Sequence, residues 1–277
     1  MKDSHGRGQQ HEVGSAVSVK HKIAGELTQL VTCQLDPEQA VYANASKFRW
    51  KTTNVSIETR LSSPGGTAQP EKKGGLLGSA LATATEVGKR ALAGQSLAFQ
   101  WFRPAGGSGL VAFAGEMPGQ VRALELDGSV GWFAERGAFV CAEDSVAFDI
   151  AFTGLALGRR AREGFVLQHF TGSGTLIVGG GGSLIEIDPA AYGGKIQVHA
   201  GAVAAFTDTV SFDVERVGAL NAQTAMTAVF GGQGLYLVTL SGTGTVLLQS
   251  TLHGTLRAED DRETERPGLA GSVLSQL

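Results

Sequence analysis

Charged residues are scarce in this chain, and the basic ones are outnumbered. Only 18% of its 277 residues are charged, against about 25% in an average soluble domain. The 23 lysines and arginines stand against 26 acidic residues, which leaves a formal net charge of −3. Nucleic-acid-binding proteins carry a basic excess, because neutralised phosphates supply most of their affinity. We therefore expect no binding to nucleic acid.

Long apolar runs and paired cysteines are also missing. No stretch approaches the ~20 apolar residues of a membrane-spanning helix, and the polar segment 1–13 has no apolar signal core. The two cysteines, Cys33 and Cys141, lie far apart and form no C-x-x-C pair, so we expect both to be reduced and semi-buried. These absences predict a cytoplasmic protein without a membrane span.

Sequence motifs for catalysis and cofactor binding are incomplete. Residues 94–98 read GQSLA, which lacks the second glycine of a hydrolase elbow and stands before a strand instead of a helix. A phosphate loop would need serine or threonine after the Gly-Lys at 88–89, where Arg90 stands. We therefore predict a protein that is not an enzyme, with no catalytic residues and no cofactor.

Glycine, in contrast, is abundant, with 40 residues in the chain. Glycine adopts positive φ at little cost and is therefore common in tight turns. Together with ample valine, leucine, isoleucine and phenylalanine, this composition is typical of many short strands joined by turns. It predicts an all-β fold.

Two sequence motifs recur in the same order. Residues 143–150 read EDSVAFDI and residues 207–214 read TDTVSFDV, 64 positions later, with a weaker copy, TNVSIET, at 53–59. Residues 164–178 read GFVLQHFTGSGTLIV, and residues 234–248 read GLYLVTLSGTGTVLL. Such recurrence is typical of repeated architectures. We infer three diverged copies of one β-unit.

Within the copies, apolar and polar residues alternate. Val146 and Phe148 in one copy, and Val210 and Phe212 in the next, are each separated by one residue. This period of two indicates strands with one buried face, so we expect these four side chains in the core. Turn signals at regular spacing indicate a sandwich, jelly roll or barrel.

The copies predict a domain plan. We expect a disordered N-terminal tail at 1–17, a triplicated β domain at 18–257 and a disordered C-terminal tail at 258–277. The repeats span about 18–127, 128–192 and 193–257.

The stretch 62–93 has no counterpart in the other copies. Leu77, Leu81, Ala84 and Val87 fall at helical spacing within it. We expect this helical insert either to pack on the β domain or to dock to a protein partner, a second copy of the chain or a membrane surface.

Four stretches together resemble a known family: KRALAGQSLAFQWF at 89–102, PGQVRALEL at 118–126, RGAFVCAEDSV at 136–146 and GQGLYLVTLSGTGTVLLQS at 232–250. They are similar to the altered-inheritance-of-mitochondria family, member twenty-four, of the mitochondrial biogenesis type, which has many bacterial members. The resemblance implies a shortened, jelly-roll-like double-stranded β-helix, similar to the trp RNA-binding attenuation protein subunit. It further implies three repeats of that unit in a pseudo-threefold arrangement. It brings no assigned reaction or functional residues.

Three carboxylates occupy equivalent positions in the copies: Glu58, Asp149 and Asp213. A threefold arrangement would gather them near its axis, where they would repel one another or bind a cation. Alternatively, each faces solvent or pairs locally with a basic residue, which is the more common case.

Two further sets of side chains are candidate site residues. His169, His199 and His253 form no H-x-H pair and do not recur between copies, so we predict no metal site. The aromatic residues that form either a binding patch or part of the core are Trp50, Trp101, Phe102, Trp132 and Phe133.

Two functions remain open at this point. The absent catalytic motifs and the family resemblance, whose mitochondrial members are associated with inner-membrane organisation, favour a non-enzymatic interaction or scaffold protein. The alternative is a small-molecule or RNA-binding module of the attenuation-protein-like fold, although the net charge of −3 counts against RNA.

Overall fold

A computed structural model describes residues 18–60, 99–153, 166–216 and 236–252. These residues form eighteen β-strands and three short 3-10 helices, which confirms the all-β fold. Within these ranges no helix has the length and apolar character needed to cross a bilayer. The predicted tails at 1–17 and 258–277 and the predicted helical insert at 62–93 lie outside the described residues.

The strands fall into three groups, which we call the first, second and third units. The first contains β1 (Lys20–Ala24), β2 (Leu30–Leu35), β3 (Val41–Ala43), η1 (Ala45–Lys47), β4 (Phe48–Lys51), β5 (Val55–Arg60), β6 (Phe99–Pro104) and β7 (Gly109–Ala114). The second contains β8 (Val121–Asp127), β9 (Trp132–Glu135), β10 (Phe139–Glu143), β11 (Val146–Thr153) and β12 (Val166–Gly179). The third contains β13 (Leu184–Ile187), η4 (Pro189–Tyr192), β14 (Lys195–His199), η5 (Ala200–Ala202), β15 (Val203–Thr207), β16 (Val210–Arg216), β17 (Tyr236–Gly242) and β18 (Val246–Gln249).

The same antiparallel pairings recur in each unit. β5 pairs with β6, β11 with the first half of β12, and β16 with β17. Likewise β2 pairs with β7, β8 with the second half of β12, and β13 with β18. By this pairing β8 and β13 belong to the second and third units, so these two units begin one strand before the boundaries expected at 128 and 193.

A bulge recurs at the same place in each unit. The register shifts between Phe48 and Trp50 where β4 pairs with β7. It shifts at the equivalent place where β10 pairs with β12, and where β15 pairs with β18. A bulge inserts one residue and bends its strand. The pairings and the bulge together align the three units residue by residue.

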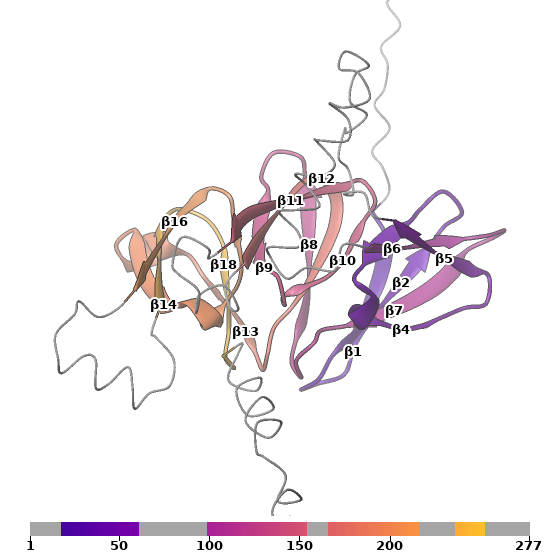
Figure 1. Ribbon diagram of the computed structural model, residues 1–277, viewed down its shortest axis with the longest axis horizontal. Coiled ribbons are helices and arrows are strands. Elements are labelled where there is room, and N and C mark those ends of the chain that lie inside the picture. Colours follow the sequence, from indigo (N-terminus) through magenta and orange to yellow (C-terminus); the bar gives the residue numbers. More distant parts are fainter. Residues whose placement is uncertain (1–17, 61–98, 154–165, 217–235, 253–277) are drawn as a thin grey trace, which may run out of the picture.

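Two strand pairings join the units into a row. β3 of the first unit pairs with β10 of the second, and β9 of the second pairs with β15 of the third. Figure 1 shows the resulting order, with the first unit in purple at one end and the third in orange at the other. Descent of the units from one repeated sequence stays a prediction, as do the pseudo-threefold arrangement and the double-stranded β-helix.

Aromatic rings fill much of the core. Tyr42, Phe99 and Phe139 pack with ring centroids 5.5–6.2 Å apart, distances at which rings attract one another. The Tyr42 hydroxyl donates to the Val146 carbonyl oxygen at 3.1 Å, and burial raises the pKa of this phenol well above its ordinary value.

The predicted core residues are distributed unevenly. Val146, Phe148 and Val210 are buried, whereas Phe212 is only half-buried. Among the five candidate aromatic residues, three are buried, Phe133 is half-buried and Trp50 is exposed. The buried ones are Trp101, Phe102 and Trp132. Cys33 and Cys141 are both free thiols in the core, and burial raises the pKa of Cys141.

Candidate functional site

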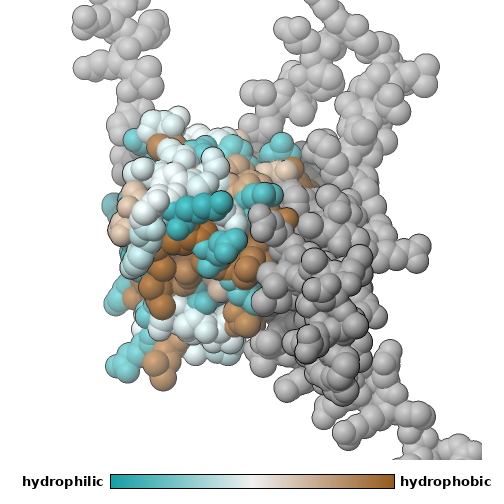
Figure 2. Space-filling model, turned by 90° about the vertical axis from the view of Figure 1, so that its left-hand side faces the viewer, coloured by the Kyte–Doolittle hydropathy of each residue, from teal (hydrophilic) through white to brown (hydrophobic). Residues whose placement is uncertain are grey.

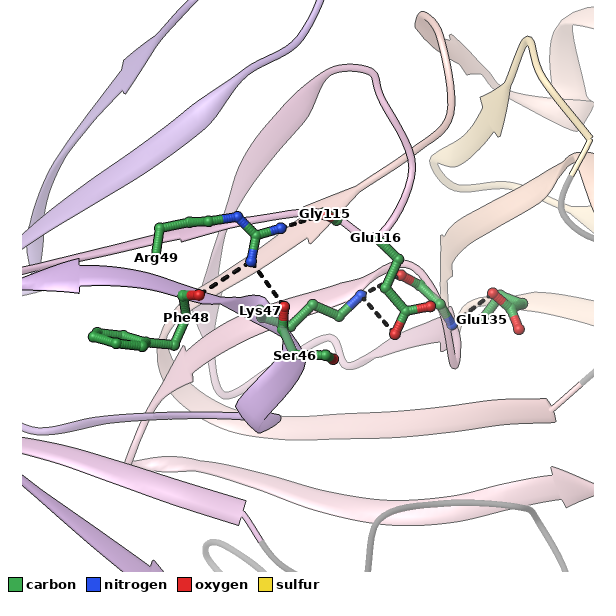
Figure 3. Close-up of polar contacts among 8 residues, drawn as sticks. Ser46, Lys47, Phe48, Arg49, Gly115, Glu116 and Glu135 are labelled. Atoms are coloured by element: carbon green, nitrogen blue, oxygen red, sulfur yellow. Dashed lines mark hydrogen bonds and ion pairs between the residues drawn. The ribbon is translucent and has the colours of Figure 1, made fainter. Parts of the chain in front are cut away.

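A fully buried lysine lies where the first unit meets the second. Lys47 ends the 3-10 helix η1, and none of its side chain is exposed. The bulge alignment places it where Ala138 and Ala202 stand in the other units. Its Nζ donates to the carbonyl oxygen of Gly137 at 2.8 Å and lies 3.4 Å from Oε1 of Glu116 (Figure 3).

Residues from both units hold this lysine. Glu116 lies in the link from β7 to β8, and the guanidinium of Arg49 donates to the Gly115 carbonyl oxygen of the same link at 3.1 Å. From the second unit, Oε2 of Glu135 accepts the N–H of Gly137 at 2.7 Å. The cluster therefore joins β4, the linking segment and the β9–β10 turn.

The environment of Lys47 acts on its charge in two directions. Burial lowers the pKa of the amine, because removal from water disfavours the charged form. The carboxylates of Glu116 and Glu135 oppose this effect by stabilising the ammonium. A lysine with a lowered pKa can serve as a nucleophile, but the Nζ of Lys47 has no exposed surface that a substrate could reach. The geometry supports a structural role.

An open hollow of about 340 Å³ lies between the first and second units and is lined mainly by carboxylates. Three of them already have partners. Glu143 accepts the N–H of Val19 at 2.8 Å, Asp144 pairs with Arg103 at 3.0 Å, and Asp36 accepts the Ser108 hydroxyl at 2.8 Å. Among the described residues, no group of three or more His, Cys, Asp or Glu side chains could hold a metal ion.

The three carboxylates at equivalent positions each interact locally. Glu58 pairs with Arg60 at 2.7 Å, and this hydrogen bond lowers its pKa. Asp149 accepts the N–H of the residue that follows it at 2.7 Å, and Asp213 does the same at 2.9 Å. All three are exposed, on strands of different units. These contacts agree with local pairing at a solvent-facing position.

The histidines have separate structural contacts. His169 stacks on Phe133 with ring centroids 4.5 Å apart, and its Nε2 lies 3.2 Å from Asp208 of the third unit. Nδ1 of His199 accepts the N–H of Gly201 at 3.0 Å and so caps η5. His253 lies outside the described residues, as do the motifs at 88–90 and 94–98.

The two ends of the row are the strongest candidate for a functional surface. At the first-unit end, β4 pairs only with β7 among the described residues. Trp50 on this strand is 42% exposed, although the equivalent residues of the other units, Cys141 and Ala205, are fully buried. Trp50 is visible in the sequence as an aromatic residue, but the open strand edge around it is not.

The third-unit end also has an edge strand, β14. β14 pairs only with β17 within the described ranges, and its Ile196 and Val198 are half-buried. The equivalent residues of the other units are all buried: Val41 and Ala43 in β3, and Trp132 and Ala134 in β9. Figure 2 faces this end and shows apolar side chains gathered beside hydrophilic ones. A partly exposed apolar patch of this kind is typical of an interaction site.

Comparison with known proteins places the fold. The chain matches the family model described as Mitochondrial biogenesis AIM24 over residues 21–251. None of the curated proteins matches it. The crystal structure of protein SPYM3_0169 from Streptococcus pyogenes is similar, with a TM-score of 0.65 and 22% identity, over 88% of this chain and 99% of that chain. That likeness shows the fold alone. Because the family model spans most of its length, the chain belongs to the mitochondrial biogenesis AIM24 family.

Proposed function

We propose that this chain is a non-enzymatic interaction or scaffold protein that binds protein partners through the two ends of its row of units. One observation carries the proposal. Positions that are buried wherever two units meet are only half-buried at the β14 end, as at Ile196 and Val198, and 42% exposed at Trp50 of the β4 end. An interaction protein needs such surfaces, since apolar area removed from water supplies most of the free energy of association.

The buried polar cluster supports the same function. Lys47, Glu116 and Glu135 join the first two units instead of lining a reaction site. A joint of this kind holds the ends of the row in a defined relative position, which a scaffold requires. A cytoplasmic location is part of the proposal. The predicted insert at 62–93 is a further proposed contact, for a protein partner or for peripheral attachment to a membrane.

Position-specific crosslinking in cells tests this function. A photoreactive amino acid replaces Val198 at one end, Trp50 at the other, or Leu27 as the control, which is apolar and 86% exposed but lies between β1 and β2. We expect discrete protein adducts from positions 198 and 50 and none from position 27. Absence of adducts at both ends, or equal labelling at all three positions, would contradict the proposed function.

A further inference from the structure

We infer that the partner at both ends is a second copy of this chain, whose β14 edge adds to the β4 edge of the next copy. The inference rests on the proposed function and gives it a specific occupant. It is drawn from the two junctions inside the chain, because each shows how one unit continues the sheet of its neighbour. At the ends of the row, the equivalent edge strands, β4 and β14, have no described strand on their outer side.

The two internal junctions share one register. At the first, Tyr42 of β3 stands opposite Ala142 of β10. At the second, Phe133 of β9 stands opposite Phe206 of β15. The alignment of the units makes Tyr42 equivalent to Phe133, and Ala142 equivalent to Phe206. A strand that slips by one residue presents its side chains to the wrong face, so this agreement defines one interface used twice.

A backbone hydrogen bond extends each junction by one more pair. The N–H of Asp144 donates to the carbonyl oxygen of Ala40 at 3.0 Å, and the N–H of Asp208 donates to that of Gly131 at 2.9 Å. The same alignment makes Asp144 equivalent to Asp208, and Ala40 equivalent to Gly131. At the first junction, the turn after β10 therefore lies against the residue that precedes β3. At the second junction, the turn after β15 lies in the same way against the residue that precedes β9.

Applied to the open edges, this register specifies the contact between two copies. Gln197 of one copy stands opposite Lys51 of the next, Val198 opposite Trp50, and Ile196 opposite Thr52. The N–H of Thr53 then donates to the carbonyl oxygen of Lys195. The register places no like charges opposite each other, which would be destabilising in a paired sheet. The lysines on these edges therefore do not prevent the pairing.

The apolar side chains at the two ends also complement each other. Inside the chain, Ala134 and Ala205 stand opposite each other and belong to one buried cluster. The equivalent pair across two copies is Val198 and Trp50, a half-buried and a 42% exposed side chain in the single chain. Their contact would cover both, as an aromatic residue and a β-branched residue pair favourably across strands.

The contact is head-to-tail. β14 meets β4, two different surfaces, so each added copy leaves one β14 edge and one β4 edge uncovered. Such an interface produces a ring if the rotation closes and a filament if it does not. In either case, assembly stops when one of the two edges is blocked.

Two proline variants of the full chain block one edge each. In an antiparallel sheet, every second residue directs its N–H and carbonyl to the same neighbour. The carbonyl oxygen of Gly194 accepts the N–H of Gly242 of β17. Every second residue from Gly194 therefore faces β17, and Gln197, which lies between two such residues, directs its N–H outward. By equivalence with Ala142, Lys51 does the same on β4. Proline removes the N–H and is tolerated on an edge strand. Gln197→Pro and Lys51→Pro thus remove an outward donor, while Gln197→Ala and Lys51→Ala retain it as controls.

Light scattering coupled to size exclusion measures the mass of each species. We expect wild type and both alanine variants to assemble at high concentration, and each proline variant alone to be monomeric. An equimolar mixture of the two proline variants should give a heterodimer and nothing larger. The intact β4 edge of Gln197→Pro pairs with the intact β14 edge of Lys51→Pro, and the two edges left over are both blocked. Circular dichroism monitors folding. If a proline variant unfolds, Trp50→Lys and Val198→Lys replace the pair, with the same expected masses.

Either of two results overturns the inference: a wild type that is monomeric at every concentration, or proline variants that assemble as the wild type does. The crosslinking experiment separates this failure from failure of the proposed function. If position 198 gives adducts to a different protein and the wild type is monomeric, the partner is not a second copy of the chain. The interaction function then still holds. Absence of any adduct overturns both.

Discussion

The Nζ of Lys47 lies 2.8 Å from the carbonyl oxygen of Gly137, ninety residues further along the chain. This hydrogen bond crosses the boundary between the first and second units, with Glu116 beside it at 3.4 Å. A buried amine can be retained only where such partners replace water. The stability of the first junction therefore depends on Lys47.

Replacement of Lys47 by methionine should destabilise the protein. The apolar side chain fills a similar volume but leaves the Gly137 carbonyl oxygen and the Glu116 carboxylate without their donor. We expect a loss of about 2 kcal/mol in the free energy of unfolding, the usual cost of an unsatisfied buried acceptor. Urea denaturation measures it, with the exposed Lys195→Met as control. A loss no larger than that of the control would show that the contact does not hold the junction.

The contribution of Lys47 should depend on pH in the alkaline range. Burial lowers its pKa in the folded protein below the 10.5 of a free lysine. Between these two values the unfolded chain binds more protons than the folded one, so stability rises with pH there. The free energy of unfolding of wild type relative to Lys47→Met should therefore increase from the lowered pKa up to pH 10.5. A difference that shrinks as pH rises would contradict the burial effect.

Two equivalent phenylalanines should differ in cost when truncated. Phe148 is 5% exposed and packs on Phe99 with ring centroids 5.1 Å apart. Phe212, at the equivalent position of the third unit, is only half-buried. We expect Phe148→Ala to lose about 3–5 kcal/mol and Phe212→Ala clearly less. Guanidinium denaturation of both variants makes the comparison, and equal losses would mean that the third unit is as well covered as the second.

Gly119 should not tolerate a side chain. It forms a bridge to Gly182, and a methyl group added there would overlap the backbone of Gly180 and Gly182. Overpacking of this kind costs about 1–3 kcal/mol, so Gly119→Ala should lower the thermal midpoint by several degrees. Gly115→Ala is the matched control, because the nearest atom to its added carbon is the Met117 carbonyl oxygen at 3.4 Å. Similar midpoints for the two variants would refute the close approach.

Much of the local fold was predictable because it depends on local pattern. The alternation around Val146 and Val210 predicted strands with a buried face, and both residues are buried in β11 and β16. The same alternation predicted full burial of Phe212, which is only half-buried and packs against the edge of a core cluster beside Phe206. Periodicity shows which face a side chain occupies, but burial also requires a neighbouring unit to cover that face.

The candidate site was largely missed, for a physical reason. A lone lysine in a polar stretch normally projects into solvent, so nothing local indicates that Lys47 is buried. One signal existed in the repeats. The Gly137-Ala138 pair recurs as Gly201-Ala202, and alignment places Lys47 at the small alanine position. The open edges left no such signal, because pairing between units is set by three-dimensional position and not by local sequence.

Amide hydrogen exchange at the two edges tests the central claim, that the ends of the row are binding edges for another copy of the chain. NMR spectra of the full chain would follow the N–H groups of Gln197 and Lys51 over a dilution series, with Ile196, which faces β17, as the internal control. Hydrogen-bonded strand amides exchange slowly, and unpaired edge amides exchange fast. The account predicts that protection of Gln197 and Lys51 rises together with protein concentration while that of Ile196 stays constant. Fast exchange of both edge amides at every concentration would contradict it.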